Sequence, residues 1–137
     1  MIKKLAPIAV AILAVAGCQT TPSSTTPEPL LLGSWHIEQV YDHPVIDYSP
    51  AQLIFEPKGK LTGNNSCNHF FGSYIQDGNQ LTLMPAGTTR KACVDALMIQ
   101  ETRVSDALPK VHSFREAKGK MLLLDETGQT IVIMSRF

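Results

Sequence analysis

The sequence carries no excess charge of either sign, contains no internal repeat, and has no apolar run long enough to span a membrane. Twelve Lys and Arg residues balance twelve Asp and Glu residues in a chain of 137 residues. Because nucleic-acid and polybasic membrane surfaces need clustered positive charge, the sequence predicts neither. A spanning helix needs about 20 apolar residues, so we also predict no transmembrane helix.

The first 17 residues have the composition of a signal peptide. Two lysines precede the apolar stretch from Leu5 to Ala16, which has the length of a signal-peptide core. The ending Val-Ala-Gly-Cys at 15–18 resembles a bacterial lipobox. The resemblance implies cleavage before Cys18 and acylation of its thiol, with palmitate among the acyl chains. Ordinary secretory cleavage after a small residue is the alternative.

An acylated Cys18 would make the membrane a partner of this chain. One acyl chain binds a membrane only marginally, whereas two or more hold it stably. Gln19, not Asp, follows Cys18. By resemblance to enterobacterial lipoprotein sorting, this implies the outer membrane, with the domain in the periplasm. Residues 18–31 are rich in Ser, Thr and Pro, so we predict a lipidated cysteine followed by a disordered tether.

Residues 32–137 have the size of one domain and are rich in strand patterns. Apolar and polar residues alternate over 34–41, which places Trp35 and Ile37 on the core face and Val40 on the other. Further strands are predicted over 52–56, 61–62, 71–76, 80–84, 112–116, 121–125 and 130–135. Turn residues separate them, including Pro-Lys-Gly-Lys at 57–60 and Asp-Gly-Asn at 77–79.

Between the two groups of strands, the apolar period changes to that of a helix. The residues that recur at helical spacing are Val94, Leu97, Met98, Val104, Leu108 and Val111. They predict an amphipathic helix that ends near Pro109. The sequence thus predicts a mainly β fold with one helix (α+β), a small antiparallel, barrel-like twisted sheet capped by that helix.

Two motifs in this domain resemble those of the META domain, also called the HslJ-like domain. The first is Gly-Asn-Asn-Ser-Cys-Asn-His-Phe-Phe-Gly-Ser-Tyr at 63–74, and the second is Thr-Thr-Arg-Lys-Ala-Cys at 88–93. Glu101 in the predicted helix fits the same pattern. The family-motif residues are Gly63, Cys67, Asn68, Phe71, Gly72, Thr89, Arg90 and Cys93. His69 and Lys91 stand where Arg and Met are frequent in the family.

The resemblance implies a secreted or lipid-anchored protein associated with heat shock, stress or motility, a family to which no general reaction is attributed. It also suggests a hydrophobic cavity, because the family is structurally similar to a lipid-binding pilotin of type III secretion. We therefore predict no catalytic residue, no metal, no cofactor and no nucleic-acid partner.

One cysteine lies in each motif, and we predict that Cys67 and Cys93 form a disulfide. With Cys18 acylated, they are the remaining pair in a compartment where disulfides persist. A metal site and a nucleophilic cysteine activated by a histidine are the alternatives. The metal ligands would be Cys67, His69 and Cys93, with a fourth from His36, His43 or His112.

Arg90 lies in the loop before the predicted helix. Its guanidinium could bind an anion or a partner's carboxylate. The interpretation we favour is that it donates to loop carbonyls while Thr88 or Thr89 organises the turn. Three asparagines are predicted to form turns with unusual backbone angles, and three aromatic residues to pack beneath them. These are Asn64, Asn65 and Asn68, and Phe70, Phe71 and Tyr74.

Three functional classes follow from these patterns. The one we favour is a noncatalytic cell-envelope lipoprotein with a stress-related or envelope-assembly role, whose partner would be an envelope protein. The second is a module that binds a small hydrophobic ligand or lipid inside the barrel. It would require an apolar cavity left unfilled by Trp35, Phe55, Phe71 and Leu123. The third is an enzyme or a metal-homeostasis protein.

Overall fold

The structure, a computed structural model, describes residues 31–137, which form nine antiparallel strands and one α-helix. The strands are β1 (Gly33–Val40), β2 (His43–Pro44), β3 (Gln52–Glu56), β4 (Lys60–Asn64), β5 (His69–Asp77), β6 (Gln80–Thr88), β7 (Ser113–Ala117), β8 (Lys120–Leu124) and β9 (Thr130–Arg136). Helix α1 spans Asp95–Ala107, and two short 3-10 helices, η1 (Pro57–Gly59) and η2 (Leu108–Lys110), follow β3 and α1. The predicted signal peptide, Cys18 and the tether up to residue 30 lie outside the described residues.

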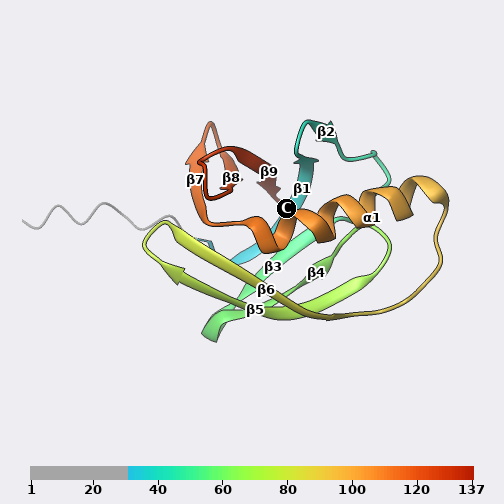
Figure 1. Ribbon diagram of the computed structural model, residues 1–137, viewed down its shortest axis with the longest axis horizontal. Helices are drawn as coiled ribbons and strands as arrows, with labels where there is room; N and C mark the ends of the chain where they lie inside the picture. Colours follow the sequence, from blue (N-terminus) through green and yellow to red (C-terminus); the bar gives the residue numbers. More distant parts are fainter. Residues whose placement is uncertain (1–30) are drawn as a thin grey trace, which may run out of the picture.

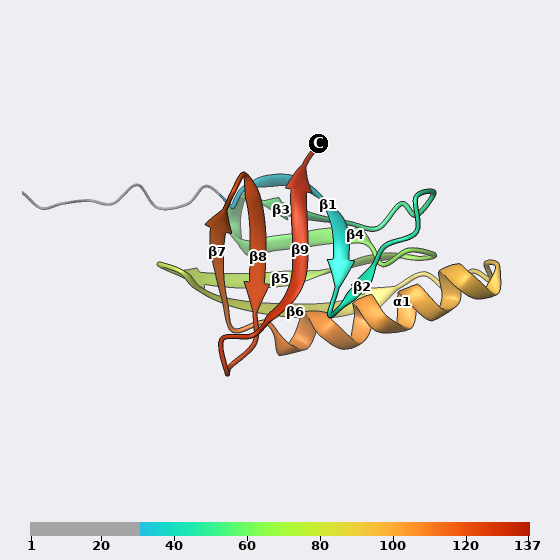
Figure 2. The ribbon, with the colours of Figure 1, turned by 90° about the horizontal axis from the view of Figure 1, so that it is seen from above.

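The strands close into a ring because β1 pairs with both β3 and β9 (Figure 1). From β3 onward each strand pairs with the next, so the strand order follows the chain. The ring is weakest between β6 and β7, where only Gln80 and Ser113 are paired. Helix α1 runs alongside β6 at this seam (Figure 2). The predicted mainly β, barrel-like sheet with one helix is confirmed.

Apolar side chains fill the interior of the ring. Trp35, Phe55 and Leu123 are all buried, as predicted for core residues. Helix α1 adds Val104 and Ala107 to the same core. The largest fully buried side chains are Phe55, Phe114, Leu31, Ile37, Leu53, Leu61, Leu81, Leu108, Met121, Leu123, Met134 and Val40. Within 31–137, no helix has the length and apolar character needed to cross a membrane.

The first predicted strand is correct in position but wrong at Val40, which is buried and not outward-facing. The pairing of β1 with β9 shifts register between Ile37 and Gln39. A bulge of this kind adds one residue to one strand and so reverses the alternation beyond it. Val40 therefore faces the same side as Trp35 and Ile37.

Phe71 was predicted to pack in the interior, but its side chain is 60% exposed on the outer face of β5. Phe70 and Tyr74 are buried, as predicted. Phe70 covers Gly63 on β4, and Phe71 covers Gly87 on β6, because a Cβ atom at either glycine would meet the ring within 2.8 Å. These two aromatic side chains pack on opposite faces of the same sheet, each against the glycine of a neighbouring strand.

The predicted helix exists, but two residues of its predicted apolar face are exposed. Val94 precedes the helix and is 61% exposed, and Met98 is 38% exposed. The buried residues of α1 are Gln100, Val104 and Ala107. The N-terminal half of the inward face is polar because it packs against a polar turn, not against the apolar core.

We predict that two adjacent phenylalanines differ strongly in their contribution to stability. Phe70→Ala removes a buried ring and should lower the free energy of unfolding by about 3–5 kcal/mol. Phe71→Ala removes an exposed cross-strand contact and should cost about 0.2–1 kcal/mol. Urea unfolding followed by tryptophan fluorescence measures both values. Equal losses would contradict the placement of the two rings.

Candidate functional site

The two motif segments meet at the N-terminal half of α1, and the side-chain amide of Asn68 joins them. Asn68 Oδ1 accepts hydrogen bonds from the backbone N–H of Lys91 (2.6 Å) and the hydroxyl of Thr89 (2.9 Å). Asn68 Nδ2 donates to Glu101 Oε1 (3.0 Å) and Oε2 (3.1 Å). One buried amide therefore holds the β4–β5 turn, the loop after β6 and helix α1 together.

Glu101 is the acceptor at the centre of this arrangement. Asn65 Nδ2 donates to Glu101 Oε1 (3.2 Å) and to Ser105 Oγ (3.1 Å). Asn65 and Asn68 together direct amide hydrogens at both oxygens of the Glu101 carboxylate. No ion pair joins Glu101 to a cationic side chain in the described part of the chain.

A second buried cluster fixes the loop after β2 to the same end of the helix. Gln100 Nε2 donates to the hydroxyls of Ser49 and Ser66 (3.0 Å to Ser66), and Gln100 Oε1 accepts from the backbone N–H of Ile46 (3.0 Å). Ser66 has φ +113°, a strained value for a residue with a side chain. The predicted unusual backbone angle thus falls on Ser66, whereas the asparagines stabilise the turn through their side chains.

Cys67 and Cys93 form a disulfide, as predicted. It links the β4–β5 turn to the residue two positions before α1. Both sulfur atoms are thereby unavailable as metal ligands or nucleophiles. Among residues 31–137, no three His, Cys, Asp or Glu side chains are grouped to hold a metal ion.

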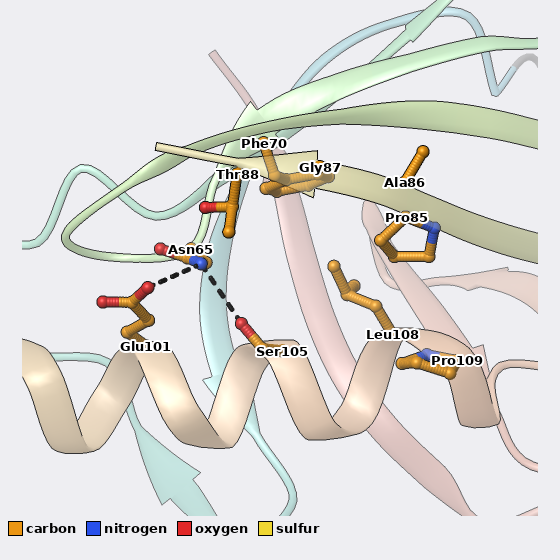
Figure 3. A pocket seen from close by; sticks show the side chains of 10 residues that line it. All are labelled: Asn65, Phe70, Pro85, Ala86, Gly87, Thr88, Glu101, Ser105, Leu108 and Pro109. Carbon is orange, nitrogen blue, oxygen red and sulfur yellow. Dashed lines mark hydrogen bonds between the residues drawn. The ribbon is translucent and has the colours of Figure 1, made fainter. Parts of the chain in front are cut away.

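An open cleft of about 250 Å³ lies between β6 and α1, directly beside this network (Figure 3). One end is polar, with Asn65, Glu101 and Ser105. Figure 3 shows the dashed hydrogen bonds of Asn65 there. The other end is apolar. The residues that line the cleft are Asn65, Phe70, Pro85, Ala86, Gly87, Thr88, Glu101, Ser105, Leu108 and Pro109.

The wall of this cleft is a strand edge without a partner strand. In an antiparallel pair of strands, every second residue directs its N–H and C=O toward the paired strand, and the residues between them direct both groups away from it. Thr89 N–H donates to the carbonyl of His69 on β5, so the backbone groups of Thr88 point away from β5. Outside the strand ladders, no backbone hydrogen bond of residues 31–137 involves the Thr88 N–H. Pro85, which lacks an N–H, lies on the same strand, as expected for an edge.

A separate polar cluster holds the other end of α1 to the end of β1. Tyr41 Oη donates to Asp106 Oδ2 (2.9 Å), and Lys110 Nζ donates to the same oxygen (2.7 Å). The hydrogen bond from Lys110 lowers the pKa of Asp106, and burial raises the pKa of Tyr41. The ion pair between Lys110 and Asp106 is exposed, so we assign it an orienting role with little effect on stability.

The predicted motif residues divide into those that build this site and those that do not. Cys67, Asn68, Thr89 and Cys93 build it. Gly63 and Gly72 allow close strand contact, since a Cβ at either would overlap a backbone carbonyl of the neighbouring strand. Phe71 faces outward on the opposite side of the sheet.

The predicted hydrogen bonds from Arg90 to loop carbonyls are not seen within 31–137, where its side chain is exposed. The turn is organised as predicted by its threonines. Thr88 Oγ1 donates to the carbonyl of His69, and Thr89 Oγ1 donates to Asn68. Four polar residues of the site were not identified from the sequence as a group: Ser49, Ser66, Gln100 and Ser105. Their only signal was a pair of polar residues, Gln100 and Glu101, in the middle of the predicted helix.

Comparisons with known proteins agree with this architecture. The META domain family model matches residues 28–136. No curated protein matches the chain significantly. An NMR structure of a protein from Burkholderia xenovorans is similar, with a TM-score of 0.62 and 24% identity, covering 96% of this chain and 98% of that one. A DUF4847 family protein from Bacteroides vulgatus shares the fold, with a TM-score of 0.59 and 14% identity, covering 77% of this chain and 92% of that one.

We predict that Asn68→Asp destabilises the domain at neutral pH by about 1–3 kcal/mol. The substitution removes the two N–H donors to Glu101 and sets a second carboxylate against it. The negative charge of Glu101 raises the pKa of the new carboxyl in the folded state above its value in the unfolded state. The loss of stability should therefore become smaller as the pH falls through the folded-state pKa and the new carboxyl is protonated. Urea unfolding at neutral and acidic pH measures this.

The exposed turn residue Asn79 offers a matched control, and Asn79→Asp should leave the urea midpoint nearly unchanged. Adding Glu101→Gln to Asn68→Asp should restore part of the lost stability, with a coupling of about 0.5–3 kcal/mol. Equal midpoints for the two Asp variants would reject the central role of Asn68.

Reduction of the disulfide should also weaken the domain. The two cysteines are 26 residues apart, and closing a loop of this size contributes about 3.5 kcal/mol in the chain-entropy model. Adding a reductant should therefore lower the urea midpoint of the parent chain. The reductant should leave the urea midpoint of the double variant Cys67→Ala, Cys93→Ala unchanged. A midpoint independent of reductant in the parent would contradict the prediction.

Proposed function

Because the chain belongs to the META domain family, we propose that it is a noncatalytic lipoprotein of the cell envelope whose domain binds a partner protein. The META domain is not a known enzyme family. The anchor in this proposal is acylated Cys18, and Gln19 favours the outer membrane with the domain in the periplasm. A stress-related or envelope-assembly role fits such a tethered domain.

One observation carries the binding role: the buried polar groups and both cysteines of the site are occupied in holding the fold. In the described residues, every buried side-chain nitrogen and oxygen has a hydrogen-bond partner. Cys67 and Cys93 are bonded to each other, and Glu101 accepts hydrogen bonds from two asparagines. A fully satisfied polar network makes a domain rigid, which favours a binding surface over a reactive centre.

The alternative is a barrel that binds a small hydrophobic ligand in its interior. Trp35, Phe55, Phe114 and Leu123 occupy that interior, and protein interiors of this kind are close-packed. Phe71 lies outside this interior, whereas its neighbour Phe70 is buried. The filled interior therefore supports the surface-binding role over the interior-ligand role.

Native mass spectrometry of the mature chain, released from membranes in a non-ionic detergent, tests this proposal. We expect a chain that begins at Cys18, carries acyl groups, has two hydrogens fewer than the reduced form, and holds no further lipid or metal. Cys18→Ser should block acylation and leave residues 1–17 attached, while Ser23→Ala should behave as the parent does. A stoichiometric lipid beyond the acyl groups would favour the alternative.

A further inference from the structure

The cleft between β6 and α1 combines three features that together suit a bound peptide. The first is the unpaired edge of β6. Its Thr88 backbone groups point away from β5, and β7 pairs with β6 only at the far end of the strand, at Gln80. An extended peptide that adds to such an edge gains main-chain hydrogen bonds, a recurring mode of peptide recognition.

The second feature is a negative charge without a cation beside it. Glu101 lies at the polar end of the cleft, where Asn65 and Asn68 fix the position of its carboxylate. The four ion pairs of the described chain do not include it. A positively charged group of a ligand would therefore find an oriented, uncompensated carboxylate.

The third feature is an apolar hollow at the other end. Pro85 on β6 faces Leu108 and Pro109 across the cleft (Figure 3). The volume of about 250 Å³ is below the range of about 300–1,000 Å³ that is usual for drug-sized ligands. The size suits one or two side chains of a peptide better than a whole lipid or cofactor.

We propose that this cleft binds an extended segment of a partner protein, with a basic side chain against Glu101 and an apolar side chain against Leu108. The inference rests on the proposed binding role and names the chemistry of the partner. Side chains on one face of a strand are two residues apart, so the basic and apolar residues occupy positions i and i+2. In an antiparallel addition to β6 the basic residue comes first.

Three synthetic fluorescein-labelled heptapeptides test this recognition on the mature acylated chain in non-ionic detergent. The first is Ser-Val-Lys-Val-Leu-Thr-Ser, with Lys and Leu on one face. The second, Ser-Val-Lys-Leu-Val-Thr-Ser, has the same composition but places them on opposite faces. The third replaces Lys of the first peptide by Glu. Equal composition in the first two controls for adsorption to the micelle.

We expect the first peptide to bind at least about tenfold more tightly than either of the others, since a charge-assisted hydrogen bond contributes about 1.5–3 kcal/mol. Glu101→Gln should weaken it by a similar factor and remove its salt dependence. Ser105→Phe places a large side chain in the cleft from an exposed position and should also abolish binding. Thr102→Phe, also exposed on α1 but outside the cleft lining, is the matched control.

Hydrogen exchange of the Thr88 amide gives a second readout, which does not depend on any variant. This amide should exchange rapidly in the free chain and become protected when the first peptide binds. Three equal affinities, binding that leaves Thr88 unprotected, or no binding up to about 1 mM would each overturn the proposal.

The two proposals fail in different ways. If the mature chain is acylated and carries no ligand but binds none of the peptides as expected, the cleft proposal falls and the lipoprotein assignment stands. If a lipid co-purifies in stoichiometric amount, the assignment as a partner-binding module falls whatever the peptides do.

Discussion

The side-chain amide of Asn68 is the constraint from which the rest of this domain follows. The turn between β4 and β5 is buried, so its polar groups must find partners inside the protein. An asparagine amide offers both acceptor and donor atoms, and here the acceptor takes Lys91 N–H and the Thr89 hydroxyl while the donor reaches Glu101. Segments that are 21 to 33 residues apart along the chain are thereby fixed by one side chain. The disulfide next to it adds a covalent link between two of the same segments.

Fixing these segments places α1 beside the part of β6 that β7 does not pair with. With its N-terminal half held by Asn65, Asn68 and Gln100, the helix lies alongside β6 (Figure 2). The chain then reaches β7 after η2, and β7 pairs with β6 only at Gln80. The cleft and the unpaired strand edge therefore result from the same hydrogen bonds that hold the turn. A change at Asn68, which does not itself line the cleft, would therefore alter the cleft indirectly.

Local patterns predicted much of the fold, and their failures have local causes. Alternation located β1, and turn residues located the β5–β6 hairpin, because both depend on neighbouring residues. Alternation could not locate the bulge in β1, so Val40 was placed on the wrong face. With two adjacent phenylalanines, only strand register decides which one is buried. The motif resemblance predicted part of the site, including Asn68 and the disulfide. The contact between Asn68 and Glu101 was not predictable because the two residues are 33 positions apart in the chain, and because the inward-facing helix residues here are polar where an apolar stripe is the usual sign.

The same network explains why a carboxylate at this position suits binding better than catalysis. A general acid or base needs a carboxylate oxygen that is free to face its substrate, whereas both oxygens of Glu101 already accept amide hydrogens from the fold. A carboxylate held in a fixed position needs little reorganisation when a cation arrives, so less of the interaction energy is lost in ordering the site. Its amide partners remain in place whether or not a ligand is bound. The carboxylate of Glu101 then selects a basic residue in the peptide. The distance from Glu101 to the apolar hollow at Leu108 selects the spacing between this basic residue and the apolar one.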